Sequence, residues 1–101
     1  MFALRIVCEE VLDHYEWPIV RDGEVVWLVE DEYGDYDHYT DYGDGHIPLD
    51  VLLFDTEEEA KEFLVSKDML WYIKPKSYEV VCVEPVYETK IVGWKKTSST
   101  E

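Results

Sequence analysis

The chain has 101 residues, of which 24 are acidic and nine are basic, so its formal net charge is −15. This length allows one domain with one modest core, and 47% hydrophobic with 33% charged residues is typical of a globular chain rather than a disordered one. The negative charge disfavours direct binding to nucleic acid, whose phosphates would repel the protein, and no apolar run approaches the ~20 residues of a membrane-spanning helix.

The N-terminal residues 2–8 are predicted to form a strand, because every second residue from Phe2 to Cys8 is apolar and falls on one side. The following residues 9–16 have apolar spacing that allows a short helix. The first residues of the chain lack the layout of a signal peptide, so we expect a cytoplasmic protein.

A hairpin is predicted next, centred on the dipeptide Asp22-Gly23. This dipeptide supplies the positive φ angles that a tight primed turn needs. The flanking segments 17–21 and 24–29 are rich in β-branched and aromatic residues, as hairpin strands are.

The segment of residues 30–44, here called the tyrosine-acid segment, stands out for its repeat. A tyrosine occupies every third position from Tyr33 to Tyr42, acids lie between them, and no lysine or arginine interrupts the run. It has almost no aliphatic side chains with which to form a core, and its carboxylates repel one another unless water, a metal or a cationic partner surrounds them. Two interpretations follow: a solvated, partly disordered loop, or a surface of phosphate-like charge that carries flat phenol rings.

Residues 51–54 are predicted to form a short buried strand, and the main helix is predicted over about residues 56–67. Thr56 is a good N-cap because Glu59 follows three residues later, the spacing of a capping box. Three consecutive glutamates suit the positive end of the helix dipole.

The C-terminal third is predicted to contain two strands, residues 78–84 and 86–94, joined at Pro85. The domain then spans residues 1–94, and residues 95–101 form a polar tail. Both cysteines, Cys8 and Cys82, lie in apolar runs and are expected to be buried free thiols. Together these elements predict an α+β fold: a small, mostly antiparallel sheet of about five strands with one main helix packed on a face.

No constellation of catalytic residues appears, so we expect a protein that is not an enzyme and needs no cofactor. His38 and His46 lie among the acids of the tyrosine-acid segment, but the spacing of an EF-hand calcium loop is absent. Two histidines eight residues apart are a weak zinc signal. A calcium- or zinc-binding module therefore stays an alternative rather than the leading hypothesis.

The charge is unevenly spread along the chain. Residues 1–60 hold 18 acids and two bases, a net charge of −16, whereas residues 61–101 hold seven bases and six acids, a net charge of +1. Because duplex DNA carries about one negative charge per 1.7 Å of axis, a net charge of −16 matches about 27 Å of duplex. In size, acidity and lack of catalytic residues the chain resembles small phage-encoded DNA mimics, the inhibitors of restriction, CRISPR and other DNA-handling proteins. The resemblance is one of character and includes no shared motif.

The leading hypothesis is a non-enzymatic inhibitor that occupies the cationic groove of a nucleic-acid-binding host protein. Its acids would stand in for phosphates, and its tyrosines would supply flat contact area. The predicted partner-binding residues are Asp31, Glu32, Tyr33, Asp35, Tyr36, Asp37, Tyr39, Asp41, Tyr42 and Asp44. The other alternative is a small structural or interaction domain whose acidic loop is merely solvated.

Overall fold

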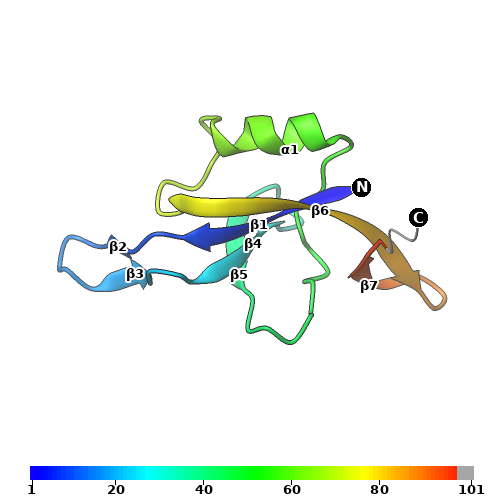
Figure 1. The fold of residues 1–101 in the computed structure, drawn as a ribbon. Coiled ribbons are helices and arrows are strands. Elements are labelled where there is room, and N and C mark those ends of the chain that lie inside the picture. Colours follow the sequence, from blue (N-terminus) through cyan, green and yellow to red (C-terminus); the bar gives the residue numbers. More distant parts are fainter. Residues whose placement is uncertain (98–101) are drawn as a thin grey trace.

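The computed structural model describes residues 1–97, and its centre is an antiparallel sheet of five strands in the order β5-β4-β1-β6-β7 (Figure 1). The strands are β1 (Phe2–Cys8), β4 (Val25–Glu30), β5 (Tyr36–Thr40), β6 (Pro75–Tyr87) and β7 (Ile91–Lys96). One helix, α1 (Glu57–Leu64), accompanies them in the described residues. The expected α+β character and five-stranded antiparallel sheet are therefore confirmed. The molecule is elongated, with extents of 46 × 27 × 26 Å.

The chain reverses at residues 13–17 rather than at Asp22-Gly23, so the predicted hairpin is wrong. Two further short strands, β2 (Val11–Leu12) and β3 (Pro18–Val20), pair with each other and form an arm beyond β1 and β4 (Figure 1). The predicted short helix over residues 9–16 is absent because β2 and this turn occupy that segment.

Gly23 does adopt the positive φ that its sequence predicts, at 83°. Its N–H, however, donates to the carbonyl of Cys8 at 2.9 Å, and the N–H of Cys8 donates to the carbonyl of Glu24 at 2.8 Å. Asp22-Gly23 is thus an irregularity within a long antiparallel pairing. The local preference for positive φ is satisfied there without reversing the chain.

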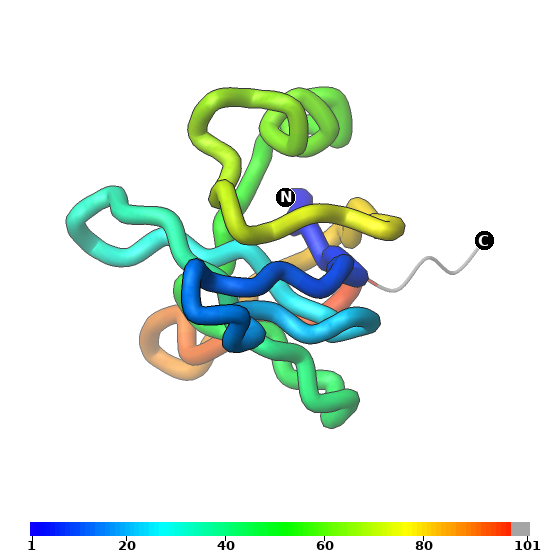
Figure 2. The backbone as a smooth tube through the Cα atoms, turned by 90° about the vertical axis from the view of Figure 1, so that its left-hand side faces the viewer, coloured from blue at the N-terminus to red at the C-terminus, as the bar shows by residue number. Residues whose placement is uncertain are grey.

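The sheet has an apolar layer on each face, as the alternation of strand side chains dictates. Buried residues on the α1 face are Leu4, Ile6, Cys8, Val20, Val26, Leu28, Leu52, Phe54, Ala60 and Ile73. Buried residues on the other face are Ala3, Trp27, Ile47, Val51, Val81 and Val83. Figure 2 shows α1 on one side of the sheet and the segment of residues 41–50 on the other.

Helix α1 begins as predicted but is shorter than the expected helix over residues 56–67. The side chain of Thr56 accepts a hydrogen bond from the N–H of Glu59 at 3.1 Å, so the N-cap is confirmed. The helix ends after eight residues, where the hydroxyl of Ser66 donates to the carbonyl of Phe63 at 2.8 Å. A serine that bonds a nearby carbonyl in this way competes with helix continuation. The helix is therefore a small element rather than the main one.

Three of residues 51–54 are buried, but the segment forms two isolated bridges rather than the predicted strand. Val51 bridges to β4 and Phe54 bridges to Phe2 of β1. The segment inserts where β1 and β4 no longer pair with each other, so it completes the backbone hydrogen bonds of both.

Strand β6 runs through Pro85 instead of ending there, and the turn to β7 comes at residues 88–90. The N–H of Val83 donates to the carbonyl of Met1, on the β1 side of β6, at 2.8 Å. Because N–H direction alternates along a strand, an N–H at position 85 would lie on the same side as that of Val83, away from β7. The pairing with β1 ends before Pro85, so the proline removes no hydrogen bond of the sheet.

The predicted tail begins later than expected, because Lys95 and Lys96 belong to β7, and residues 98–101 of that tail lie outside the described residues. The cysteines differ from the prediction in one respect. Cys8 is buried, and this burial, with Glu24 nearby, raises the pKa of its thiol to about 11. Cys82, in contrast, is exposed.

Candidate acidic binding surface

The tyrosine-acid segment forms the edge of the sheet. Strand β5 pairs with β4 alone among the described residues, in a register that places Tyr39 opposite Trp27 and His38 opposite Leu28. The segment is therefore not a disordered loop. We define the acidic edge as residues 30–46, that is, β5 with the turns on both sides. It holds seven acids and no lysine or arginine.

The first turn of the acidic edge is held by Asp31. Its carboxylate accepts the N–H groups of Tyr33 at 2.8 Å and of Asp35 at 2.9 Å. Gly34 has a φ of 83°, which an L side chain rarely adopts. Because the turn is fixed by backbone groups, the side chains of Glu32, Tyr33 and Asp35 remain exposed, and the exposed fraction of Tyr33 is 82%.

The two faces of β5 have different environments. Tyr36 faces the α1 side, where its ring meets that of Phe63 edge-on at a centroid distance of 5.2 Å. Asp37 and Tyr39 alternate with Tyr36 along the strand and are exposed. Tyr36 is therefore a packing residue, whereas Asp37 and Tyr39 are open to a partner.

Tyr72 is a contact residue of the edge that sequence reasoning missed. Its hydroxyl donates to a carboxylate oxygen of Asp37 at 3.1 Å and lies 3.3 Å from Nδ1 of His38. Burial, followed by the charge and hydrogen bond of Asp37, raises the pKa of Tyr72 to about 12. Nothing in the sequence signals this contact, because 35 residues separate the two side chains.

Asp41, in the second turn, is neutralised inside the molecule. A carboxylate oxygen lies 2.8 Å from Nε of Arg5, and only 6% of the Asp41 side chain is exposed. Burial alone would raise the pKa of this carboxyl. The N–H of Gly43 and the charge of Arg5, with a smaller contribution from Lys96, outweigh burial and hold the pKa below its usual range. Asp41 thus anchors the turn to β1.

A small cavity of about 180 Å³ lies at this anchor. It is lined by Arg5, Trp27, Asp41, Gly43, Gly45 and Lys96. The indole N–H of Trp27 has no hydrogen-bond partner among residues 1–97, but this nitrogen is itself buried, so a ligand in the cavity does not reach it.

Beyond the anchor, the second turn is again exposed. The exposed fraction of Tyr42 is 80%. The carboxylate of Asp44 accepts the N–H of His46 at 3.0 Å and remains exposed. Of the ten predicted partner-binding residues, Tyr36 and Asp41 are held by the protein's own packing and charge. The eight exposed ones are Asp31, Glu32, Tyr33, Asp35, Asp37, Tyr39, Tyr42 and Asp44.

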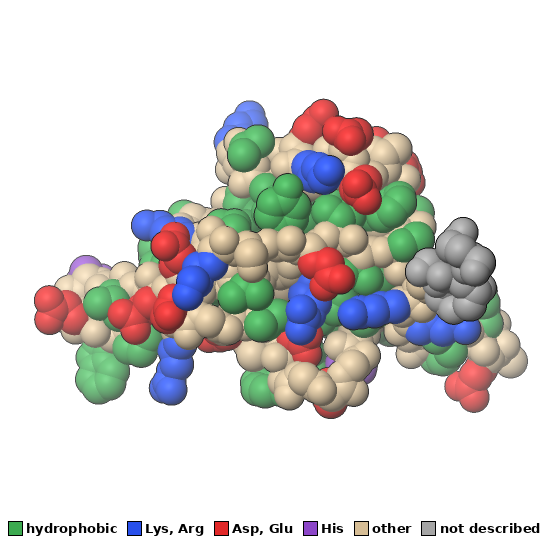
Figure 3. Space-filling view, in the orientation of Figure 1, with side chains coloured by type: hydrophobic (Ala, Val, Ile, Leu, Met, Phe, Trp, Pro, Cys, Tyr) green, Lys and Arg blue, Asp and Glu red, His purple; other side chains and the backbone are tan. Residues whose placement is uncertain are grey.

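Charge differs from one side of the sheet to the other. The acidic edge lies at the β5 side, whereas residues 75–96, which contain β6 and β7 at the opposite side, hold four lysines and three glutamates. On the face shown in Figure 3, acidic and basic side chains are interspersed. Five carboxylates of residues 1–97 lie within 4.0 Å of a lysine or arginine nitrogen, those of Asp22, Asp41, Glu57, Glu79 and Glu84. Most of the negative charge is therefore not compensated within the described residues.

The described residues contain no group of three or more His, Cys, Asp or Glu side chains placed to hold a metal ion. His46 packs near Tyr39, with ring centroids 5.7 Å apart, and His38 packs against Tyr72. In the same part of the chain, no helix is long and apolar enough to cross a membrane.

Comparison of the chain with protein-family models, with curated proteins and with solved structures finds no match in any of the three. We therefore infer a function from the charge and geometry of the acidic edge.

Proposed function

We propose that this protein is a nucleic-acid mimic, which inhibits a nucleic-acid-binding protein by placing its acidic edge in the partner's cationic groove. One observation carries the proposal: the acidic edge holds seven acids and no lysine or arginine, and among residues 1–97 Arg5 pairs with only one of them, Asp41. Uncompensated charge of one sign on an open sheet edge produces a directed field, which a uniformly mixed surface does not.

The charge density of the molecule is compatible with imitation of a polynucleotide. The net charge of −15 spread over the 46 Å long axis corresponds to about one charge per 3 Å. One strand of duplex DNA carries about one charge per 3.4 Å. The whole molecule thus carries about as many negative charges per length as one DNA strand, and the acidic edge holds seven of its acids.

The exposed tyrosines fit the same partner. Tyr33 and Tyr42 are the most exposed tyrosines of the edge, at 82% and 80%. A phenol ring gives flat contact area at a small cost in conformational entropy and stacks on arginine guanidinium groups. Grooves that bind nucleic acid present arginine, lysine and aromatic side chains, so carboxylates with phenols are a matching surface.

Capture from a bacterial lysate tests the proposal. The immobilised protein should retain nucleic-acid-binding proteins at low salt and release them at high salt, since screening weakens contacts between charged surfaces. Free duplex DNA should displace the same proteins. The variant Glu32→Lys, Asp35→Lys, Asp44→Lys should lose the capture while its circular dichroism stays unchanged.

A matched control separates the acidic edge from net charge. The variant Glu9→Lys, Glu10→Lys, Glu62→Lys changes the net charge equally at exposed positions outside the edge. It should keep most of the capture. If both variants lose capture equally, or if DNA does not displace the captured proteins, the edge is not a polynucleotide mimic. The alternative of an interaction domain with a solvated acidic surface would then hold.

A further inference from the structure

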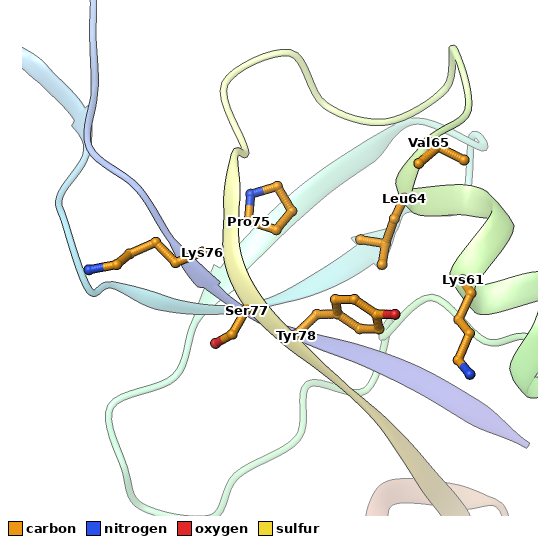
Figure 4. Close-up of a pocket in the computed structure, with 7 residues that line it drawn as sticks. All are labelled: Lys61, Leu64, Val65, Pro75, Lys76, Ser77 and Tyr78. Carbon is orange, nitrogen blue, oxygen red and sulfur yellow. The ribbon is translucent and has the colours of Figure 1, made fainter.

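A groove outside the acidic edge lies between α1 and the first half of β6 (Figure 4). Its volume is about 570 Å³. It is lined by Lys61, Leu64, Val65, Pro75, Lys76, Ser77 and Tyr78. Two lysines and no acid line this groove, in a protein whose acids outnumber its bases 24 to nine. We call it the α1–β6 groove.

Apolar side chains lie between the two lysines. Leu64 and Tyr78 extend into the space between the helix and the strand (Figure 4). Tyr78 is 46% exposed and Val65, just after the helix, is 87% exposed. Burying such side chains against a partner is favourable, at about 25 cal/mol per Å² of apolar surface.

The backbone of β6 is open along this groove. Among residues 1–97, β6 pairs with β7 only from Val83 onward, while its first half pairs with β1 alone. The N–H of Val83 donates toward β1, and the carbonyl of Cys82 accepts the N–H of Thr97 on the opposite side. By alternation along the regular part of the strand, Tyr78 and Val80 direct their N–H and carbonyl groups to the open side.

The lysines of the groove are available to a ligand. Lys76 lies 3.2 Å from a carboxylate oxygen of Asp22, and Lys61 lies 3.5 Å from one of Glu57. All four side chains are between 44% and 64% exposed. Exposed ion pairs of this kind contribute little, so a carboxylate that arrives with a partner strand can replace them.

We propose that the α1–β6 groove binds an extended acidic peptide segment of a partner protein by strand addition. The segment pairs with the open backbone of Tyr78 and Val80. Its apolar side chains cover Leu64 and Tyr78, and its carboxylates meet Lys61 and Lys76. Main-chain hydrogen bonds supply affinity in this mode of recognition, and the side-chain contacts supply specificity.

The test uses a synthetic peptide with a valine–threonine–valine–threonine–valine centre and two glutamates at each end, labelled for fluorescence anisotropy. The full-length protein should bind it saturably at submillimolar concentration. The same peptide with glutamines in place of the glutamates should bind at least about threefold more weakly, because each exposed charge contact changes affinity by a modest factor.

Two pairs of variants locate the site. Lys61→Glu with Lys76→Glu should lower the affinity about tenfold, whereas Lys90→Glu with Lys95→Glu makes the same change of net charge and should leave affinity within about twofold. Tyr78→Pro removes an outward N–H, and Tyr78→Ala keeps it. The proline variant should therefore bind more weakly than the alanine variant, while circular dichroism shows both folded.

The proposal is overturned by any of three results: no saturable binding of the acidic peptide, equal binding of the glutamine peptide, or equal losses in the two lysine variants. The variant Glu32→Lys, Asp35→Lys, Asp44→Lys should bind the peptide at least as well as the unmodified protein. Failure of the α1–β6 groove is thus distinguishable from failure of the acidic edge.

Discussion

The sheet has two edges with unpaired backbone groups, and the side chains around these two edges differ in charge. Strand β5 is open along its whole length, and the first half of β6 is open on the side away from β1, among the described residues. The acidic edge around β5 has seven acids and no base, whereas the α1–β6 groove is lined by two lysines and no acid. An unpaired strand edge is a template for any other strand. Charge therefore decides which partner each edge admits.

The comparison also separates side chains that hold an edge in place from side chains that face a partner. On the acidic edge, Tyr36 packs inward and Asp41 is paired with Arg5, so these two residues stabilise the fold. Tyr33 and Tyr42 make no such contribution and are exposed. Mutations that treat all ten predicted residues alike would mix these effects.

Replacing tyrosines one at a time should have the largest effect on stability. We expect Tyr36→Ala to lower the free energy of unfolding by about 2–3 kcal/mol, because it removes a half-buried ring that packs against Phe63. Tyr33→Ala should change it by less than about 0.5 kcal/mol, as exposed positions do. Urea denaturation measures both. Equal losses would show that the inward and outward faces of the edge are not distinct.

The second largest effect on stability is expected at the ion pair between Arg5 and Asp41. Arg5→Ala leaves the Asp41 carboxylate enclosed without its cation, so we expect a loss of about 1–3 kcal/mol at neutral pH. Because the folded pKa of Asp41 is depressed, its contribution is present above the unfolded pKa of about 3.8 and is lost as pH falls through the folded value.

The acid limb of the stability curve tests that sign. Between neutral pH and about pH 2, the unmodified protein should lose more stability than Arg5→Ala does, because the variant lacks the interaction that keeps Asp41 ionised. Denaturation at several pH values measures the difference. Parallel curves for the two proteins would contradict a role for Arg5 in ionising Asp41.

Local signals in the sequence located part of this architecture. The alternation of residues 2–8 predicts β1, and Thr56 with Glu59 predicts the start of α1, because both depend on neighbours along the chain. Two other features depend on which distant strand lies alongside. Asp22-Gly23 lies within an antiparallel strand pairing, and residues 36–40 form β5 against β4. A segment with almost no aliphatic residues does not indicate a strand until β4 pairs with it.

The candidate site shows the same limit. The sequence marks residues 30–44 as one unit, because the tyrosine repeat and the absence of lysine and arginine can be read directly from it. Which carboxylate is neutralised was not predictable, because Arg5 and Asp41 are 36 residues apart and meet only across the sheet. The α1–β6 groove has no sequence signal at all, because it is made by a helix end and a strand edge from separate segments.

Weakening α1 should affect the α1–β6 groove more than the acidic edge. Thr56→Ala removes the N-cap acceptor for the N–H of Glu59, and we expect a loss of about 1 kcal/mol in the free energy of unfolding. Lys61 and Leu64 belong to this helix, so peptide binding in the α1–β6 groove should weaken as well. Capture by the acidic edge should change less, because its exposed acids lie on β5 and its turns, and Tyr36 also stays paired within the sheet. A parallel loss at both edges would indicate global unfolding instead.

Removal of exposed charges should have the smallest effect on stability. The salt dependence of that effect compares the two edges directly. At low ionic strength, Glu32→Gln with Asp35→Asn should stabilise the protein by about 0.2–0.5 kcal/mol, because it removes repulsion among neighbouring acids. Lys61→Gln with Lys76→Gln should destabilise it by a similar amount, because each lysine lies near an acid. Thermal denaturation in dilute buffer and in 1 M salt, where the Debye length is about 3 Å, measures both shifts. Both should vanish in high salt if they arise from charge. A shift that persists there would have to come from packing, and the contrast between the edges would then not be electrostatic.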